Sequence, residues 1–241
     1  MALATGATGT DPGNEGGADS SANRTSQAYN DLRALLLSGH YEPDSRLTES
    51  ELTTRLGVSR GTLRSVLARL AQEGYVTAEA HRSARTRSFS VNEALEILET
   101  REVLETALAA SAARRATDAD IAAMTETCER MWECQVPGGR DEYWRLNRRF
   151  HEQIRATARH ATLTRFVDSL LYPLVMQQYR DADRAHPRTD SVKEHEAILA
   201  TIATRNPEAA AAAMKHHLSA ARRALQLQLA EPADPPPPTG R

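Results

Sequence analysis

The sequence lacks the features that carry a chain into or across a membrane. No apolar run approaches the length of a membrane span, and no basic region followed by an apolar stretch opens the N-terminus. Cysteine is scarce too, because Cys128 and Cys134 are the only two. In a helical pattern their side chains point about 240° apart around the axis, so they should not bond to each other. We therefore expect no membrane partner, no disulfide framework and a cytoplasmic location.

Positive charge is not in excess. The 241 residues contain 30 Lys and Arg against 32 Asp and Glu, a formal net charge of −2. Only Lys193 and Lys215 are lysines, so the basic residues are almost all arginine. A basic field over the whole molecule is excluded. Any binding of nucleic acid must come from a local patch of arginines.

Changes in composition divide the chain into four parts. Residues 1–24 are mostly small or polar, and residues 231–241 include four consecutive prolines, so both ends are expected to be disordered tails. Between them we expect a small domain over residues 25–89 and a larger domain over residues 90–230. Ser90 opens a capping box, so the second domain begins without a flexible linker. So short a connection would pass a movement of one domain to the other.

The stretch from Leu47 to Leu70 predicts two short helices joined by a tight turn. Thr48 starts a capping box, Gly57 suits the positive φ of the exit turn, and Ser59 can cap the second helix. The apolar residues of the second helix recur at i, i+3, i+4 and i+7, which predicts a buried face made of Leu63, Val66, Leu67 and Leu70.

The rest of the second helix is basic near its start. Arg60, Gly61 and Arg64 fall off the apolar face, and the stretch from Arg55 to Arg69 holds four arginines and no acid. A short helix with a basic, small-residue N-terminal end, supported by a preceding helix, is typical of a helix-turn-helix. A helical hairpin with a solvated basic face would have the same periodicity.

The residues that follow favour DNA binding. Residues 78–89 contain His81, Arg82, Arg85 and Arg87 and only one acid. Two short strands with a basic tip form the wing of a winged helix, which reaches phosphates or the minor groove. The sequence therefore predicts a wing directly after the second helix.

These elements carry a resemblance to a known family. The pattern SGxxxPxxxLxExxLxxxLGVSRxxxRxxLxxLxxxGxV runs from Ser38 to Val76 and is similar to the GntR family of bacterial transcription regulators. The family usually has Gly where this chain has Asp44, and its wing-tip glycine is missing here. The resemblance implies a winged helix-turn-helix that binds double-stranded DNA. The candidate DNA-contacting residues are Arg46, Ser59, Arg60, Gly61, Thr62, Arg64, His81 and Arg82.

The larger domain is predicted to be all helical. No strand alternation appears from Ser90 to Leu229, and turn residues divide this part into about six helices. Pro173 lies inside an apolar helical pattern and is expected to kink that helix. The predicted fold is therefore mainly α, a winged helix-turn-helix followed by an all-α helical bundle. The predicted breaks are at Thr117-Asp118, Pro137-Gly138-Gly139, His160, His186-Pro187 and Asn206-Pro207.

Polar side chains lie on the buried faces of three bundle helices. Asn147 and His151, at i and i+4, share one apolar stripe, while His195 and His217 lie on those of two other helices. His216 lies about 100° around the helix from its neighbour and should face away. A single inward histidine is most often a hydrogen-bonded core residue. Three that converge indicate a metal site, because one cation can partner every imidazole.

Arg101 interrupts the apolar face of the first bundle helix, between Leu104, Leu108 and Ile97. A buried guanidinium needs an anion. One interpretation is an intrahelical pair with Glu105, four residues on. The other is that Arg101 binds the carboxylate of a ligand. Both can hold, one without ligand and one with it.

The second half of the chain resembles the FCD effector domain of FadR-type GntR regulators. The matching motifs are RxxLE from Arg101, NxxFH from Asn147, HxxI from His195 and MxxHL from Met214. In that subgroup an Asp and three histidines hold a divalent metal, and here Asn147 stands at the Asp position. The resemblance implies the metal ligands Asn147, His151, His195 and His217, with zinc or nickel as the ion. From its place on the buried face, Arg101 is the predicted effector-binding residue, together with Glu105.

We weigh three functions. The favoured one is a homodimeric repressor that binds a pseudopalindromic operator and responds to a small organic acid held by the metal and Arg101. A second is a metal-free regulator with a larger acyl-type ligand. A third is a metal-dependent hydrolase, which needs a general base near the metal. Periodicity turns Glu152 and Glu194 outward, so no such base is expected and the chain is not expected to be an enzyme.

Overall fold

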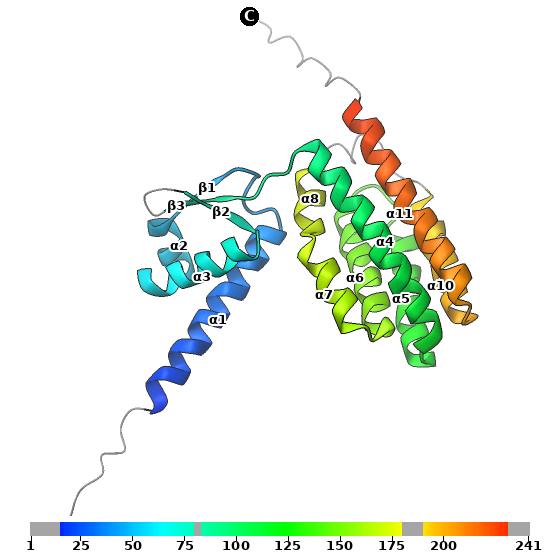
Figure 1. Ribbon diagram of the computed structural model, residues 1–241, viewed down its shortest axis with the longest axis horizontal. Coiled ribbons are helices and arrows are strands. Elements are labelled where there is room, and N and C mark those ends of the chain that lie inside the picture. Colours follow the sequence, from blue (N-terminus) through cyan, green and yellow to red (C-terminus); the bar gives the residue numbers. More distant parts are fainter. Residues whose placement is uncertain (1–14, 80–82, 180–189, 231–241) are drawn as a thin grey trace, which may run out of the picture. The chain divides into compact units, whose positions relative to one another are not determined.

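The computed structural model describes residues 15–79, 83–179 and 190–230. The chain divides into two compact units, Met1–Arg87 and Ser88–Arg241 (Figure 1). This division lies close to the domain boundary predicted at residues 89 and 90. The first helix starts at Glu15, inside the stretch 1–24 that was expected to be disordered. The predicted tail 231–241 lies outside the described residues.

The first unit combines three helices with a small antiparallel sheet. The helices are α1 (Glu15–Leu37), α2 (Glu49–Leu56) and α3 (Arg60–Gln72), and the strands are β1 (Arg46–Thr48), β2 (Val76–Glu79) and β3 (Ser83–Thr86). The strand order is β1-β3-β2, with Leu47 opposite Ala84 and Val76 opposite Thr86. This is a winged helix-turn-helix, as predicted. Its buried apolar core includes Leu32, Leu36, Leu47, Leu52, Leu63, Val66 and Leu70.

The turn between α2 and α3 has the predicted chemistry. The Thr48 side chain accepts a hydrogen bond from the backbone N–H of Glu51 at 3.4 Å, which caps α2. Gly57 ends α2 with φ of 63°, a left-handed conformation that glycine adopts without strain. The Ser59 Oγ accepts from the N–H of Thr62 at 3.2 Å and caps α3. Local sequence thus fixes where the recognition helix α3 begins.

The second unit is a helical bundle (Figure 1). Its described helices are α4 (Val91–Arg115), α5 (Asp118–Glu133), α6 (Arg140–Ala158), α7 (Ala161–Ser169), α8 (Tyr172–Gln178), α10 (Ser191–Ala203) and α11 (Pro207–Ala230). Helix α4 contacts α6, α7, α8, α10 and α11, and so lies at the centre of the packing. Fully buried apolar side chains such as Phe150, Met124, Met214 and Ile198 fill the core between these helices.

The predicted kink at Pro173 is instead a complete break. Helix α7 ends at Ser169, and Leu171 takes a left-handed φ of 55° before α8 starts at Tyr172. Pro173 then lies in the first turn of α8, where its missing N–H costs no helical hydrogen bond. The break makes α8 a short helix separate from α7.

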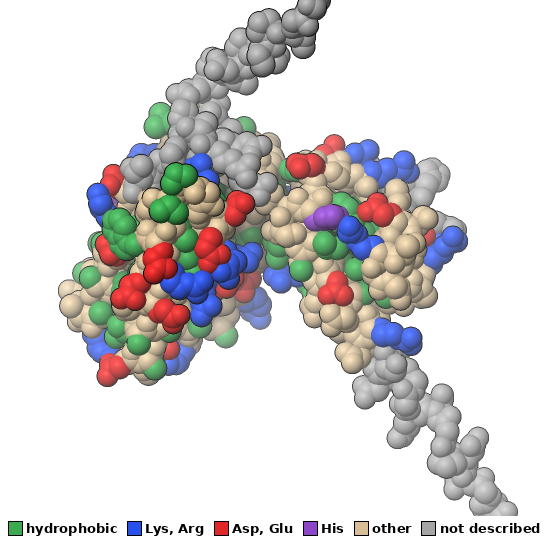
Figure 2. All heavy atoms as spheres, turned by 180° about the vertical axis from the view of Figure 1, so that it is seen from behind, with side chains coloured by type: hydrophobic (Ala, Val, Ile, Leu, Met, Phe, Trp, Pro, Cys, Tyr) green, Lys and Arg blue, Asp and Glu red, His purple; other side chains and the backbone are tan. Residues whose placement is uncertain are grey.

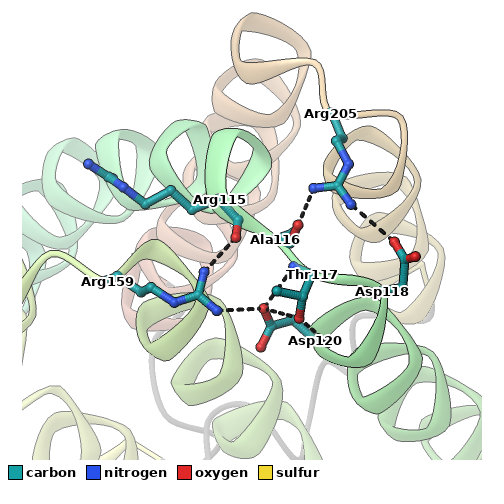
Figure 3. Close-up of polar contacts among 7 residues, drawn as sticks. All are labelled: Arg115, Ala116, Thr117, Asp118, Asp120, Arg159 and Arg205. Carbon is teal, nitrogen blue, oxygen red and sulfur yellow. Dashed lines mark hydrogen bonds and ion pairs between the residues drawn. The ribbon is translucent and has the colours of Figure 1, made fainter.

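Two arginines from distant helix ends fasten the turn between α4 and α5 (Figure 3). Arg159 and Arg205 lie just beyond α6 and α10, with left-handed φ values of 45° and 53°. Arg159 donates to the carbonyl of Arg115 and Arg205 to that of Ala116. Each also binds an aspartate in the first turn of α5, at 3.1 Å. The last carbonyls of α4 thereby gain partners that the helix itself cannot supply.

No helix among the described residues is long and apolar enough to cross a membrane. This agrees with the absence of a long apolar run in the sequence.

Candidate functional site

The N-terminal end of α3 presents the side chains expected to contact DNA. Ser59, Arg60, Gly61 and Arg64 are exposed, and Thr62 is half-buried. The opposite face of α3 is anchored in the core, since Leu63, Val66 and Leu70 are buried. Small residues at the helix start let the backbone come close to a neighbouring surface. The geometry is that of a recognition helix whose first turn can enter the major groove.

Arg64 is held in place by an acid from the preceding helix. Its Nε donates to Glu49 Oε1 at 2.8 Å and its Nη2 to Oε2 at 3.4 Å, a two-pronged pair between α3 and α2. Half of the Arg64 side chain stays accessible, at 48% of its surface, while that of Glu49 is 14% exposed. The carboxylate therefore orients Arg64 before any DNA is bound. Sequence periodicity did not indicate this pair.

A second basic group lies on the sheet. Arg46 on β1 and Arg85 on β3 are direct cross-strand partners. Like charges at opposite positions repel, and here Asp44 offsets them: Arg85 Nη1 donates to its backbone carbonyl at 2.7 Å and lies 3.6 Å from its carboxylate. A pair of arginines on an exposed ladder is suited to phosphate contacts. The predicted wing residues His81 and Arg82 lie outside the described residues.

Charge is mixed on the face of the molecule seen in Figure 2, where acidic and basic side chains are interspersed. This agrees with the net charge of −2. The arginines of α3 and the sheet are a local feature and not part of a basic field.

The three predicted histidines converge inside the bundle. His151 on α6, His195 on α10 and His217 on α11 are all buried, and one ligand atom from each lies within 4.8 Å of the others. The ring centroids of His195 and His217 are 4.4 Å apart. His216, the neighbour expected to face away, is exposed. Three separate helices thus bring their imidazoles to one point.

Two carboxylates contact the Nδ1 atoms of two of these imidazole rings. His151 Nδ1 lies 2.5 Å from Glu105 Oε2, and His217 Nδ1 lies 2.8 Å from Glu194 Oε2. The prediction that Glu194 points outward was wrong: its side chain lies at the edge of the α10 face and reaches the neighbouring α11. Glu105 contacts Arg101 and His151 and orients the imidazole. That it also binds an effector stays a prediction.

The carboxylates decide which ring nitrogens can bind a cation. A carboxylate accepts, so Nδ1–H of each ring donates to it and the lone pair of a neutral ring lies on Nε2. The Nε2 atoms of His151 and His217 face each other at 3.3 Å. Two nitrogens bound to one tetrahedral zinc ion at about 2.0–2.1 Å are separated by roughly 3.3–3.4 Å. Two facing lone pairs at this spacing repel, and a cation between them removes the repulsion. The residues present fit a divalent metal.

Burial and charge set the protonation of this group. Burial lowers the pKa of His151, and the nearby Glu105 carboxylate only partly offsets the effect, so the ring is neutral at neutral pH. Burial alone would raise the pKa of Glu105, but the charge of Arg101 and the hydrogen bond from His151 hold it well below its usual range. A neutral imidazole hydrogen-bonded to an ionised carboxylate is the form of histidine that binds metals.

Asn147 lies one turn before His151 on α6. It is 8% exposed, and its Oδ1 is buried with no hydrogen-bond partner among the described residues. A buried amide oxygen without a donor is costly, and a cation or a ligand donor would satisfy it. Its position is compatible with the fourth-ligand role implied by the family resemblance.

A cavity of about 390 Å³ opens beside these residues. Asn147 and His217 line it, and so does Arg101. The Arg101 guanidinium pairs with Glu105, Nε to Oε1 at 2.6 Å, and its Cζ lies 3.6 Å from the centroid of the Tyr172 ring on α8. The intrahelical pair predicted for Arg101 is thus present, in a side chain that also borders the cavity.

A winged helix-turn-helix followed by a helical domain that contains a cavity is the arrangement of a two-domain transcription regulator. Two family models match this chain: "Bacterial regulatory proteins, gntR family" over residues 24–85 and "FCD domain" over residues 96–220. The chain therefore belongs to the GntR family of transcription regulators and carries an FCD effector domain. The predicted family and fold class are confirmed.

Curated relatives agree. The chain is 28% identical over 185 residues to the Nta operon transcriptional regulator of Aminobacter aminovorans, covering 76% of this chain and 86% of that one. It is 25% identical over 198 residues to the transcriptional repressor GlaR of Escherichia coli, covering 79% and 90%. These relatives are regulators and not enzymes, so the hydrolase alternative is excluded.

Solved structures share the fold. Escherichia coli McbR/YncC matches with a TM-score of 0.74 at 21% identity, covering 86% of this chain and 98% of that one. A transcriptional regulator from Rhodococcus sp. RHA1 matches with a TM-score of 0.68 at 22% identity, covering 85% and 98%. At these identities the likeness concerns the fold alone.

Proposed function

We propose that this regulator is a repressor that binds a pseudopalindromic operator as a homodimer and is controlled by a small organic acid. One winged helix reads only a few base pairs, so useful specificity needs two, and a twofold dimer reads a twofold-related site. The exposed N-terminal end of α3 supports direct readout in the major groove, and Arg46 and Arg85 support contacts to phosphates.

The effector domain holds a divalent metal, zinc or nickel, on His151, His195, His217 and Asn147. The observation that carries this proposal is the distance of 3.3 Å between the Nε2 atoms of His151 and His217. The Nδ1 atom of each of these two rings is paired with a carboxylate. A cation held by the three histidines would leave a position for a carboxylate oxygen, either in place of the neutral Asn147 oxygen or beside it in a five-coordinate site. Asn147 is a neutral ligand, so the site is weaker than one with aspartate.

Arg101 supplies the second contact for the effector. Its guanidinium borders the cavity together with His217 and Asn147. A planar guanidinium can bind a carboxylate through two parallel hydrogen bonds, which fixes the orientation of the acid. Glu105 already neutralises the charge of Arg101 in the absence of ligand, so an incoming carboxylate must share Arg101 with it.

Helix α8 connects the cavity to the start of the effector domain. Tyr172, Met176 and Tyr179 line the cavity from α8 and its end. The Gln178 side chain forms a pair of hydrogen bonds with the backbone of Phe89: N–H of Phe89 to Oε1 at 2.8 Å, and Nε2 to the Phe89 carbonyl at 2.7 Å. Phe89 lies just after the division between the two units. An effector that shifts α8 therefore acts on the segment that leads to the wing.

Metal content tests the site. Wild-type protein incubated with zinc should carry the metal by elemental analysis, His195→Ala should lose it, and the exposed His216→Ala should retain it. Asn147→Asp should bind zinc more tightly, because a charged oxygen replaces a neutral one. Metal that stays in His195→Ala, or that never binds to wild type, would contradict the proposal. The metal-free regulator with a larger acyl-type ligand would then be the better description.

Effector binding is tested by thermal shift with small organic acids, with and without added zinc. A ligand that binds the folded state raises the melting temperature with the logarithm of its concentration. The stabilisation should require zinc and disappear in Arg101→Ala, whose metal content should be unchanged.

A further inference from the structure

The cavity of the effector domain is unusually aromatic for this chain. The sequence holds only six tyrosines, two tryptophans and three phenylalanines, and aromatic residues make up 5% of it. Four of these few rings line the one cavity: Tyr143, Trp144, Tyr172 and Tyr179. Two come from α6 and two from α8 and its end, so two different elements contribute. Phe150 is the one Phe, Tyr or Trp among the buried residues of the bundle core cluster, and of the four cavity rings Tyr143 packs against that cluster.

Several of these rings are held in position. Tyr143 donates its hydroxyl to Ser191 Oγ at 2.7 Å, and its ring lies 6.4 Å from that of Trp144 at an angle of 71°. Tyr172 stacks under the Arg101 guanidinium at 3.6 Å, and Tyr179 donates to the Phe89 carbonyl at 3.0 Å. The hydroxyls of Tyr143 and Tyr179 are bonded to protein groups, so these two tyrosines can offer ring surface to a ligand. A flat aromatic ring gains stacking and edge contacts there that a saturated ring cannot.

Two residues of the lining carry a buried polar atom without a partner among the described residues, Asn147 at its Oδ1 and Trp144 at its indole nitrogen. The indole Nε1 of Trp144 is buried without a hydrogen-bond acceptor. An indole N–H can only donate, and leaving it unsatisfied is costly. The other tryptophan, Trp132, instead donates its Nε1 to Glu196 at 2.5 Å and does not belong to the lining. A ligand atom that accepts a hydrogen bond would satisfy Trp144.

We propose that the effector is a planar aromatic carboxylic acid whose ring carries a hydrogen-bond-accepting substituent such as a hydroxyl or methoxy oxygen. The carboxylate binds at the Arg101 end of the cavity, the ring packs among the tyrosines, and the substituent accepts from Trp144 Nε1. A cavity of about 390 Å³ is large enough for a substituted single ring. This inference rests on the proposed function, because it names the class of acid that the site takes.

The test is calorimetry of full-length protein loaded with zinc, using three acids of the same charge. Benzoate and cyclohexanecarboxylate have the same number of carbons but differ in the π face, and 4-methoxybenzoate adds the acceptor. We expect 4-methoxybenzoate to bind most tightly, and cyclohexanecarboxylate about tenfold more weakly than benzoate. Trp144→Phe keeps a ring but removes the N–H, so it should cost about tenfold for 4-methoxybenzoate and less than twofold for benzoate. Trp132→Phe is the matched control and should change neither.

The outcomes separate this inference from the proposed function. If cyclohexanecarboxylate binds as well as benzoate, still in a zinc-dependent manner, the aromatic assignment fails and the proposed function stands. If Trp144→Phe and Trp132→Phe behave alike towards 4-methoxybenzoate, the substituent does not contact Trp144 and the inference is overturned. If none of the three acids binds, with or without zinc, the inference is overturned, and the thermal-shift screen of other small organic acids then tests the proposed function separately. Melting temperatures of both variants within a few degrees of wild type exclude a folding defect as the cause.

Discussion

At the scale of single residues, Asp44 shows how one departure from the family pattern is accommodated. The position has φ of 59°, a left-handed conformation that glycine adopts freely and that Asp tolerates better than most residues. The glycine that the family usually has at this position therefore fits the positive φ of the backbone. Here the aspartate also engages Arg85, through its carbonyl at 2.7 Å and its carboxylate at 3.6 Å. The carboxylate contact, which glycine would lack, partly offsets the strain, whereas the carbonyl contact belongs to the backbone and would remain in glycine.

The first prediction concerns this position. Asp44→Gly should change the free energy of unfolding by less than about 1 kcal/mol, because relief of strain opposes the loss of the arginine contact. Asp44→Val should destabilise by about 1–2 kcal/mol, since a β-branched residue at positive φ clashes with the backbone. Urea denaturation of the two variants measures the difference. Equal stability of Asp44→Val and wild type would show that the left-handed conformation is not required.

The second prediction concerns Arg64. If it reads a guanine, Arg64→Ala should cost about 1–3 kcal/mol of operator affinity and relax the preference at one base pair in each half-site. Binding to random DNA should fall much less. Competition binding with operator and random duplexes at fixed salt measures both losses. Equal losses on the two DNAs would make Arg64 a phosphate contact only.

Residue identity along one helix predicted the histidines but not their partners. His151, His195 and His217 were found from the apolar stripes of their own helices, because a 3.6-residue period identifies the inward face. Glu194 was assigned to the outside by the same reasoning. Its carboxylate, on a long side chain at the edge of that face, reaches His217 on α11. Which helix packs beside that edge depends on the tertiary arrangement, and a single-helix pattern does not contain it.

At the scale of elements, the start of α5 is a self-contained cap. Thr117 Oγ1 accepts from the backbone N–H of Asp120 at 3.1 Å, and the Asp120 carboxylate accepts from the backbone N–H of Thr117 at 2.8 Å. Arg159 adds a third bond to this carboxylate (Figure 3). The hydrogen bond from the Thr117 backbone is the main cause that lowers the pKa of Asp120.

The third prediction follows from this cap. Asp120→Ala should destabilise the protein by about 1 kcal/mol at pH 7. A carboxylate with a lowered pKa in the folded state stabilises fully above its unfolded pKa of about 3.9, and the effect is lost as pH falls through the folded pKa. The difference between wild type and variant in urea melts should therefore shrink in acid. Glu126→Ala, at an exposed position of the same helix, is the control for the loss of one carboxylate from α5 outside the cap.

Most helix boundaries could be read from local chemistry, and the α7–α8 break could not. Thr48, Ser59, Ser90 and Thr117 cap helices as their sequence context predicts. Around Pro173 the apolar period continues across the break, since residues of both α7 and α8 face the core. Proline is compatible with either a kink or a first turn. The left-handed Leu171 decides the outcome, and nothing in its identity predicts that conformation.

At the scale of the whole molecule, the fourth prediction is the assembly state. Sedimentation of the full chain at micromolar concentration without DNA should give about twice the chain mass of 26.5 kDa. Two winged helices related by a twofold axis then require an operator with two related half-sites. A monomer under these conditions would count against a pseudopalindromic operator.

The last prediction concerns coupling between the effector cavity and the DNA-binding unit. If the acid changes operator affinity by some factor, the operator must change affinity for the acid by the same factor, because coupling free energy is reciprocal. The paired hydrogen bonds between Gln178 and the Phe89 backbone are the main contact by which α8 reaches the segment at the start of the effector domain, and the Tyr179 hydroxyl adds one bond to the same carbonyl.

Gln178→Ala removes both bonds and leaves Arg101, the histidines and α3 unchanged. Each ligand alone should then bind within about threefold of wild type, while the reciprocal coupling factor should fall towards one. Titration of operator at zero and saturating acid, and of acid at zero and saturating operator, gives the factor twice. Lys193→Ala on α10, whose side chain pairs with Asp190 at 3.0 Å, is the exposed control and should keep full coupling. Undiminished coupling in Gln178→Ala would mean that the signal leaves the effector domain by another contact, with α4 as the remaining covalent route.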